Sequence, residues 1–442
     1  MKSVPSWPAP EVPEVAGPGV PVSLFNTATG VVEPVHPEEA RLYVCGITPY
    51  DATHLGHAAT YVAFDTLGRA WRDAGVPVLY AQNITDVDDP LLERAATSGR
   101  DWRDIAQEQT DLFREDMRAL RIVPPDVYVR VQDVIDETAD AVSRMLENGT
   151  AYRVAIGSDA SPAPVDQHAA DIYFDVRAAE RLTPWTLGES SRYSPERMAE
   201  SFREFGGDPD RDGKRDPYDP LLWRAARAGE PSWPTPVGAG RPGWHVECAV
   251  IATGTLGVTV TVQAGGRDLT FPHHELSAAH ASAMTGEPFA KHYAHAGLVA
   301  YQGTKMSKSL GNLVLVSKLT ADGHDPAAIR LAILRHHYRD DWEWSDTGLA
   351  AAEEQLRRWR AHANEVRDRA AADGTAASAA ESTAEIDGID PVDSPRVTQI
   401  RRAVANDLNT PLALAHVDGW AASGDHDPAV IDLVDALLGI RL

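Results

Sequence analysis

The stretch RLYVCGITPYDATHLGH, at residues 41–57, constrains the fold more than any other part of the chain. Its first half predicts a short buried strand that reaches Cys45, and the Gly and Pro that follow predict a turn before a helix that starts at residues 54–57. The start of such a helix exposes unpaired N–H groups and the positive end of the helix dipole, which together favour a bound phosphate. His54 and His57 lie about one turn apart and can add hydrogen bonds to that phosphate. Taken alone, the pattern also fits an ordinary helix start with two surface histidines.

A second motif, KMSKS at residues 305–309, lies far downstream of the first. On its own it also fits a surface loop rich in Lys and Ser. The pair HLGH and KMSKS, in this order, resembles the signature of the class I aminoacyl-tRNA synthetases. That resemblance implies ATP binding and activation of a carboxylate as its adenylate. It also implies an α/β Rossmann fold, in which a parallel sheet is split by a connective insertion and followed by an α-helical domain.

Within this superfamily the chain resembles the cysteine-activating branch, and the resemblance covers residues 22–346. The motifs that carry it appear in the order of that branch: CGITPYDATHLGH, NITDVDD, GWHVEC, GGRDLTFPHHE and KMSKSLGN. The branch contains two families. One is the cysteinyl-tRNA synthetases, and the other is the mycothiol-biosynthesis ligases that join cysteine to glucosaminyl-inositol (GlcN-Ins).

Composition limits the partners of the chain. With 41 basic and 65 acidic residues among 442, the net charge is −24, a poor basis for holding nucleic acid through its phosphates. Two cysteines argue against a disulfide framework, and no apolar run is long enough to span a membrane. We therefore expect a soluble, cytoplasmic protein without a membrane partner, and we expect it to be a monomer.

The pattern of apolar residues and turn signals, together with the resemblance, predicts five regions. These are an N-terminal arm and hairpin at 1–37, a Rossmann catalytic core at 38–122 and 238–300, a connective insertion at 123–237, a KMSKS loop and stem-contact region at 301–346, and a helical domain at 347–442. Residues 371–390 are poor in bulky apolar side chains and predict a flexible loop. A buried strand at 76–85 ends in Asp86, Asp88 and Asp89, for which spacing alone favours a solvated turn over a site for Mg²⁺ or a substrate amine.

The only two cysteines both lie inside motifs. From the residues alone, a buried structural cysteine is commoner than a metal ligand, and no local ligand spacing supports a metal. The resemblance implies that Cys45, Cys248 and His273 hold one Zn²⁺ with an open position for the substrate thiolate. Such a metal would select cysteine over serine, which differs by one atom and which an apolar pocket discriminates poorly.

The chain departs from the cysteinyl-tRNA synthetases near this site. Their fourth ligand is commonly a Glu at the position where this chain has Ser277, and Glu275 does not align with it. The neighbouring His245 and His274 are expected to support the site structurally or to contact its ligands. The identity of a fourth ligand stays open.

The resemblance also assigns the remaining site residues. Adenylate formation gathers negative charge, which His54 and His57 at the helix start and Lys305 and Lys308 in a closing loop would neutralise. Mg²⁺ is expected with ATP, although the sequence does not place its ligands. The cysteinyl-adenylate pocket is expected to be lined by Cys45, Gly46, Ile47, Thr48, Thr60, Asn83, Ile84, Thr85, Trp244, Gly266, Arg267, Asp268, Val299 and Lys308. Asp268 is the expected partner of the substrate ammonium, and the role of Arg267 stays open.

Four features favour the ligase family over the tRNA synthetases. The first motif lacks the Pro and Asn typical of the synthetases, and Ser277 replaces the fourth ligand. Residues 204–209, EFGGDP, resemble the ERGGDP element of the ligases with Phe205 in place of Arg; without the family comparison they read as an acidic turn. The region after KMSKS is acidic, with arginines interleaved among acids, which favours a solvated helix face over an anticodon-binding module.

We therefore expect an AMP-forming ligase that activates L-cysteine with ATP and transfers it to the amine of GlcN-Ins. A cysteinyl-tRNA synthetase is the first alternative, and a catalytically inactive binding module is a more distant one. Sequence does not identify the base that deprotonates the attacking amine or the residues that bind the inositol.

Overall fold

A parallel sheet forms the centre of the computed structural model, which describes residues 1–50, 53–157, 162–166, 168–306, 311–372 and 394–442. Within these ranges the sheet has five strands in the order β11-β10-β3-β4-β5. The strands are β3 (Ala40–Val44), β4 (Val78–Ile84), β5 (Val127–Arg130), β10 (Val260–Gly266) and β11 (Ala290–Ala296). Every neighbouring pair is parallel, and the strands are largely buried, as expected for a sheet covered by helices on both faces.

The strand order reverses at β3, and this reversal places the site. From β3 the chain continues outward through β4 and β5 on one side, and it later returns to the other side as β10 and β11. Open α/β sheets bind ligands outside the carboxyl ends of the strands at such a reversal. Cys45 follows β3 there, and the loop after β10 begins with Arg267 at the same edge.

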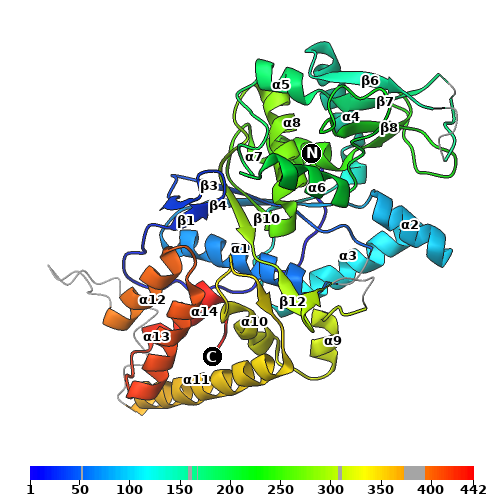
Figure 1. Cartoon of the computed structure of the whole chain (residues 1–442). Coiled ribbons are helices and arrows are strands. Elements are labelled where there is room, and N and C mark those ends of the chain that lie inside the picture. The colour runs from blue at the N-terminus through cyan, green and yellow to red at the C-terminus, as the bar shows by residue number, and fades with distance from the viewer. Residues whose placement is uncertain (51–52, 158–161, 167, 307–310, 373–393) are drawn as a thin grey trace.

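Helices flank the sheet and connect its strands (Figure 1). The helices between β3 and β5 are α1 (Leu55–Asp73), α2 (Asp89–Ser98) and α3 (Trp102–Ala119), and those beside β10 are α7 (Trp244–Leu256) and α8 (Glu275–Thr285). Short helical turns cover Val131–Asp133, Arg267–Leu269 and Thr270–His274. The class of fold predicted from the sequence, an α/β parallel sheet with an insertion and a helical domain, is confirmed.

The insertion forms a separate layer, at the top of Figure 1. Its described strands make an antiparallel sheet in the order β6-β7-β8-β9, covered by helices. The elements are α4 (Ile135–Glu147), β6 (Ala151–Ala155), β7 (Ala170–Phe174), α5 (Val176–Leu182), α6 (Pro195–Glu204), β8 (Leu221–Ala225) and β9 (Gly240–Pro242). Two boundaries differ from the expected range of 123–237, because β5 belongs to the central sheet and β9 pairs with β8.

The segment that carries KMSKS follows β11 and adds a small sheet. Its elements are β12 (Val299–Tyr301), β13 (Thr304–Lys305), α9 (Val316–Ala321), α10 (Pro326–Leu334) and β14 (Trp342–Glu343). The sheet has the order β13-β12-β14 in the part of the chain described.

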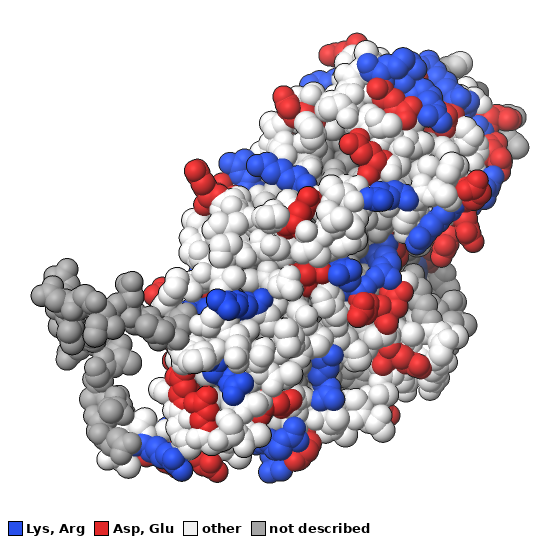
Figure 2. Space-filling view, turned by 60° about the vertical axis from the view of Figure 1, so that its left-hand side comes forward, with Lys and Arg blue, Asp and Glu red and all other residues white. Residues whose placement is uncertain are grey.

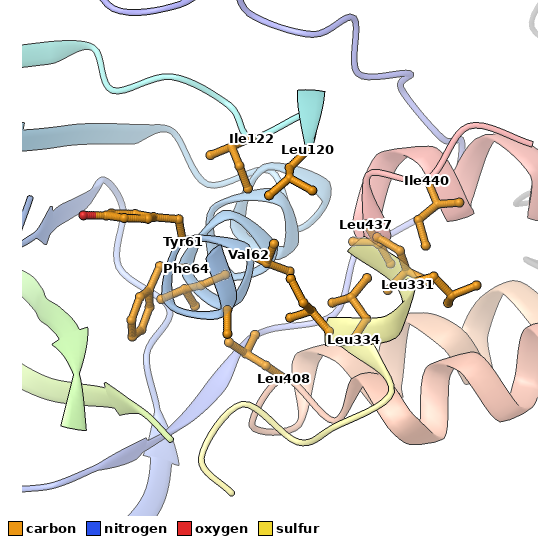
Figure 3. Close-up of a cluster of buried hydrophobic side chains, with 14 of the residues drawn as sticks. Tyr61, Val62, Phe64, Leu120, Ile122, Leu331, Leu334, Leu408, Leu437 and Ile440 are labelled. Atoms are coloured by element: carbon orange, nitrogen blue, oxygen red, sulfur yellow. The ribbon is translucent and has the colours of Figure 1, made fainter. Parts of the chain in front are cut away.

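The C-terminal helices pack directly on the helix that follows the HLGH motif. They are α11 (Asp346–Ala372), α12 (Pro395–Ala405), α13 (Thr410–Ser423) and α14 (Ala429–Leu438). Contacts join α1 to α10, α12 and α14. Figure 3 shows the buried apolar side chains between them, from Val62 on α1 to Leu331 on α10 and Leu437 on α14. The expected flexible loop at 371–390 lies almost entirely outside the described residues.

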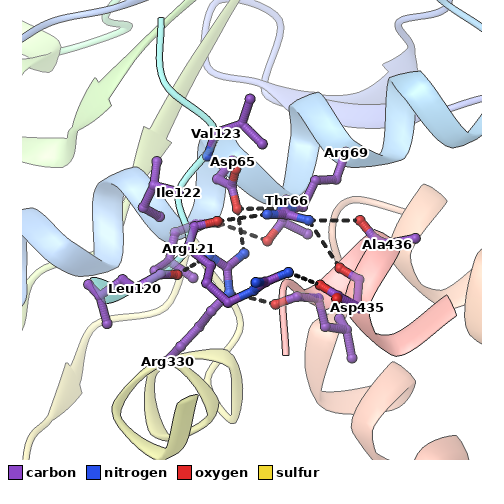
Figure 4. A network of polar contacts seen from close by, with 12 residues as sticks. Asp65, Thr66, Arg69, Leu120, Arg121, Ile122, Val123, Arg330, Asp435 and Ala436 are labelled. Carbon is purple, nitrogen blue, oxygen red and sulfur yellow. Dashed lines mark hydrogen bonds and ion pairs between the residues drawn. The ribbon is translucent and has the colours of Figure 1, made fainter. Parts of the chain in front are cut away.

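A polar cluster inside this interface holds the same helices together (Figure 4). Asp65 on α1 pairs with Arg69 at 2.7 Å and with Arg330 of α10, and all three side chains are at most 1% exposed. Arg69 also donates to the backbone oxygen of Asp435 in α14 at 3.0 Å. Burial alone would raise the pKa of the Asp65 carboxyl, but the two arginines and the Val123 N–H hold it below its ordinary value.

The N-terminal region is a packed arm followed by the predicted hairpin of β1 (Ser23–Asn26) and β2 (Val31–Pro34). Trp7 in the arm is buried and donates from Nε1 to the backbone oxygen of Ile122 at 2.8 Å. Among the described helices, each is too short or too polar to cross a membrane.

Candidate active site

A cavity of about 380 Å³ opens at the carboxyl ends of β3, β4 and β10. Its size falls within the range of small-molecule sites. The described residues that line it are Cys45, Gly46, Ile47, Thr48, Tyr50, His54, Gly56, His57, Thr60, Tyr61, Asn83, Thr85, Phe205, Trp244, Cys248, Gly266, Asp268, Leu269, His273, Gly297, Leu298, Val299, Met306 and Leu313. Most of the expected pocket residues are therefore brought together from distant parts of the chain.

One end of the cavity carries a buried cluster of two cysteines and a histidine. The ligand atoms of Cys45, Cys248 and His273 all lie within 4.8 Å of one another. The two Sγ atoms are 3.9 Å apart, and His273 Nε2 lies 3.3 Å from Cys248 Sγ. Among the described residues this is the group of Cys, His, Asp and Glu side chains that could hold a metal ion. Two thiolates and an imidazole are a donor set that suits Zn²⁺.

The surroundings of the cluster shift the pKa values of its two thiols in opposite directions and pair the free nitrogen of its imidazole. The hydrogen bond from Cys45, together with His273, holds the pKa of the Cys248 thiol well below its ordinary value, while burial raises the pKa of Cys45. His245 Nδ1 lies 3.1 Å from His273 Nδ1. When His273 uses its Nε2 lone pair for a metal, its Nδ1 carries the proton and donates to His245.

A chain of hydrogen bonds also reaches Cys45 from the other side. His274 Nε2 lies 3.2 Å from Cys45 Sγ, and His274 Nδ1 lies 2.8 Å from His295 Nε2. His295 Nδ1 in turn lies 2.8 Å from Thr27 Oγ1 on the β1–β2 hairpin. Burial lowers the pKa of both histidines, to about 3 for His295, so both rings are neutral. One consistent proton arrangement then runs from the Thr27 hydroxyl through both rings to the Cys45 sulfur.

The structure accounts for the two residues considered near a fourth ligand position. Ser277 Oγ donates to the backbone oxygen of His245 at 3.1 Å and so joins α8 to α7. Glu275 is fully buried and accepts hydrogen bonds from Trp185, Gly188, Ser190 and Ser191 of the insertion. Its carboxylate therefore anchors the insertion to α8, which leaves three ligands from the described residues.

The start of α1 forms the opposite end of the cavity. His54 caps the helix, and its Nδ1 accepts a hydrogen bond from Gly56 N at 3.1 Å, which places the ring proton on Nε2. His57 stacks on His54 with ring centroids 3.9 Å apart. Burial lowers the pKa of His57 to about 4, so it is a neutral donor and acceptor at pH 7. A helix start with two imidazoles is a suitable phosphate site.

Backbone pairing brings the KMSKS segment to this end. Leu55 N donates to Val314 O at 2.9 Å, and Val316 N donates to Thr53 O at 3.3 Å. Met306 is buried and lines the cavity. Lys305 ends β13, while its side chain and all of Lys308 lie outside the described residues. The roles expected of these two lysines stay predictions.

The loop between these ends depends on close backbone approach. A Cβ on Gly46 would lie 1.7 Å from the backbone oxygen of Asn83, so only glycine fits there. Gly46 N donates to Asn83 Oδ1 at 2.8 Å, and Asn83 Nδ2 donates to Thr85 Oγ1 at 2.9 Å. Asn83 and Thr85 face the cavity from β4 and the loop that follows it.

Two expected pocket residues face elsewhere. Ile84 is buried in the apolar core, because neighbouring side chains of a strand alternate between faces and Asn83 takes the cavity side. Arg267 pairs with Asp341 at 2.8 Å and donates to the backbone oxygen of Arg339. Arg267, whose role the sequence leaves open, therefore connects the loop after β10 to the turn before β14.

The carboxylates after β4 also differ from the solvated turn favoured by their spacing. Asp86 is 2% exposed and accepts from the backbone N and the Nε2 of Gln132. Asp88 caps α2 and accepts from Thr48 Oγ1 at 3.3 Å. Burial raises the pKa of both carboxyls to about 6. Only Asp89 is exposed, and it pairs with Arg241.

Sequence reasoning missed several wall residues. Met306 lies inside the KMSKS motif and Phe205 inside the EFGGDP element, so each had a signal in the sequence. Tyr50 and Leu269 also lie inside motifs, whereas the others reach the cavity through the path of the chain and carry no pattern of their own: Tyr61, Gly297, Leu298 and Leu313.

The fold and the cavity together define the class of the protein. The family model described as tRNA synthetases class I (C) catalytic domain matches residues 31–354, and the chain belongs to this family. A solved structure of Mycobacterium tuberculosis methionyl-tRNA synthetase bound by methionyl-adenylate is similar, with TM-score 0.59, 16% identity, and coverage of 91% of this chain and 92% of that one. The leucyl-tRNA synthetase of Agrobacterium radiobacter K84, in a ternary complex with tRNA, aligns with TM-score 0.59 at 12% identity, over 91% and 84% of the two chains. At these identities the likeness concerns the fold.

Two relatives with higher sequence identity carry the name of one ligase. The chain is 55% identical to the L-cysteine:1D-myo-inositol 2-amino-2-deoxy-alpha-D-glucopyranoside ligase of Clavibacter michiganensis subsp. michiganensis, over 99% of this chain and 98% of the relative. It is 50% identical to the protein of the same name from Paenarthrobacter aurescens, over 99% and 100% of the two chains.

Proposed function

We propose that the chain is an ATP-dependent, AMP-forming ligase that joins L-cysteine to the amine of 1D-myo-inositol 2-amino-2-deoxy-α-D-glucopyranoside (GlcN-Ins), a step of mycothiol biosynthesis. The observation that carries this proposal is one cavity with the buried Cys45–Cys248–His273 cluster at one end and the His54–His57 helix start at the other. The first suits a thiol, and the second suits a phosphate. Near-full-length relatives at 50% identity and above are named for this reaction.

In the first half-reaction, a carboxylate oxygen of cysteine attacks the α-phosphorus of ATP, and pyrophosphate leaves. His54 and His57, at the start of α1, would donate hydrogen bonds to the phosphate oxygens as negative charge develops on them. The lysines of KMSKS would neutralise the leaving pyrophosphate, and Mg²⁺ accompanies ATP. Asp268, on the cavity wall, would bind the ammonium group of cysteine.

In the second half-reaction, the amine nitrogen of the acceptor attacks the carbonyl carbon of cysteinyl-AMP. The bond from that carbon to the phosphate oxygen breaks, AMP leaves, and the nitrogen loses one proton as the amide forms. One end of the cavity suits the thiol of cysteine, the other end suits the phosphates of ATP, and Asp268 on the wall would bind the ammonium group.

Cys45, Cys248 and His273 would hold Zn²⁺, which when bound supplies a soft acceptor for the thiolate of cysteine and so discriminates against serine. His245 and His274 orient the ligands through the hydrogen bonds described above. Ser277 and Glu275 are engaged elsewhere, which supports a site of three protein ligands with room for the substrate.

The alternative acceptor, cysteine tRNA, is less favoured. Relatives at 50% identity and above carry the ligase name, and the net charge is −24. On the face shown in Figure 2, acidic and basic side chains are interspersed, so this face offers no extended basic surface for a phosphate backbone.

The test is AMP release by purified, zinc-loaded protein with ATP and cysteine, in the presence of either GlcN-Ins or unmodified cysteine tRNA. We expect the amide product with GlcN-Ins and no charged tRNA. Charging of tRNA without amide formation would overturn the ligase in favour of a cysteinyl-tRNA synthetase. If neither acceptor gives a product and there is no cysteine-dependent ATP–pyrophosphate exchange, the protein is a binding module.

A further inference from the structure

One side chain of the insertion, that of Phe205 in the EFGGDP element, lines the cavity. Among the described residues of the cavity wall, Phe205 alone comes from the chain between β5 and α7. It caps the C-terminus of α6, where its backbone N donates to Ser201 O at 3.0 Å. Its side chain is only partly buried, as expected for a wall residue that faces a ligand.

The turn that follows is built to hold Phe205 in one place. Gly206 has φ +85°, a conformation that favours glycine, and Gly207 N donates to Phe202 O at 2.8 Å. A Cβ on Gly207 would lie 2.4 Å from Phe202, so the second glycine is required by packing.

Asp208 then fixes the end of the turn. Its carboxylate accepts a hydrogen bond from the Tyr173 hydroxyl, and Lys214 Nζ pairs with it at 3.0 Å. The Lys214 side chain is 2% exposed and that of Asp208 is 41% exposed, so the pair lies at the protein surface with its lysine side covered. The element is thus a turn held by hydrogen bonds and close packing, while its acidic side chains Glu204 and Asp208 stay accessible to solvent.

The position of α6 decides which part of the cavity Phe205 borders. The helix contacts the Thr270–His274 turn, which carries His273 of the sulfur cluster. The insertion therefore approaches the cavity on the side of this turn, and Phe205 at the end of α6 lines the cavity there. An acceptor that enters along the insertion would meet the Phe205 side chain.

We propose that Phe205 is a specificity-determining residue that packs against the sugar ring of the amine acceptor. This inference rests on the proposed function. An aromatic face is an apolar surface with negative electrostatic potential, which suits the C–H bonds on one face of a pyranose ring. Its rigid support means that little conformational entropy is lost when the sugar binds.

The experiment separates binding of the acceptor from activation of cysteine. Phe205→Leu keeps an apolar side chain without the ring, Phe205→Tyr keeps the ring, and Arg203→Ala alters an exposed residue of the same helix as a control. Cysteine-dependent ATP–pyrophosphate exchange reports activation alone, and the KM for GlcN-Ins in amide formation reports the acceptor.

We expect Phe205→Leu to raise the KM for GlcN-Ins by about three- to tenfold, the effect of losing one aromatic contact, while exchange with cysteine is unchanged. Phe205→Tyr and Arg203→Ala should both retain the wild-type KM. An unchanged KM in Phe205→Leu would overturn the inference, and so would a higher KM for cysteine in the exchange assay, because Phe205 would then cover cysteine instead. Absence of amide formation by the wild type would instead overturn the proposed function.

Discussion

At the scale of single residues, the cluster of Cys45, Cys248 and His273 depends on hydrogen bonds from neighbouring side chains. Cys45 is supported by His274, His295 and Thr27, of which only His274 lies inside a motif of the predicted metal site. Hydrogen bonds of this kind set the orientation and basicity of metal ligands.

Thr27→Val tests this chain of hydrogen bonds at its far end. Loss of the hydroxyl leaves His295 Nδ1 without its donor and loosens the arrangement that fixes His274 against Cys45. We expect zinc affinity, measured by competition with a chromogenic chelator, to fall by about three- to tenfold, less than for direct loss of a ligand contact. Thr29→Val on the same hairpin is the matched control, since Thr29 is exposed and its hydroxyl donates to the backbone oxygen of Asn26 and to Glu33. Equal affinities in the two variants would exclude a role for the chain.

Residues expected at the pocket line the cavity where a motif fixes the backbone, and one of them turns away where the side chains of a strand alternate. Asn83 and Thr85 reach the cavity while Ile84 does not, because a run of consecutive residues on a strand cannot all face one side. Arg267 stands in the right loop, yet the partner that turns it away, Asp341, lies far along the chain. No local pattern could have indicated that partner.

At the scale of elements, α1 joins the phosphate end of the cavity to the C-terminal helices. Its first residues carry HLGH, while Asp65 on the same helix is buried between Arg69 and Arg330. The orientation of the phosphate site therefore depends on packing against α10 and α14 (Figure 4).

Asp65→Asn should destabilise the fold strongly, because it leaves two buried guanidinium groups without their carboxylate. We expect a loss of about 3–5 kcal/mol in the free energy of unfolding, measured by urea denaturation. Glu354→Gln, in an exposed ion pair with Arg357, is the control and should leave the free energy of unfolding nearly unchanged.

The pH dependence of this difference gives a second check. The pKa of Asp65 is lowered in the folded state, so its stabilising contribution is complete above the ordinary value of 3.8 and is lost as pH falls through the folded pKa. The gap between wild type and Asp65→Asn should therefore stay constant from about pH 8 to 5 and narrow only below about pH 4. A gap that vanishes already at pH 6 would contradict the assigned ion pairs.

At the scale of the whole molecule, the sequence predicts the architecture well because its motifs lie at the carboxyl ends of strands in one sheet. Cys45, Asn83 and Gly266 each mark the carboxyl end of a strand or the loop after it, and the fold brings these ends together at one edge. The boundaries of the insertion were less predictable. β5 has no motif, and only its pairing with β4 shows that it belongs to the central sheet.

The central claim is that the sulfur cluster and the phosphate site serve one reaction in one cavity. The most direct measurement is ATP–pyrophosphate exchange with cysteine or serine, comparing wild type with Cys248→Ser, each before and after removal of metal by a chelator. The account predicts that zinc-loaded wild type prefers cysteine by about 10³-fold or more, and that Cys248→Ser or loss of metal removes most of the exchange with cysteine. Exchange that keeps the wild-type rate and preference for cysteine in Cys248→Ser or in the metal-free protein would contradict it.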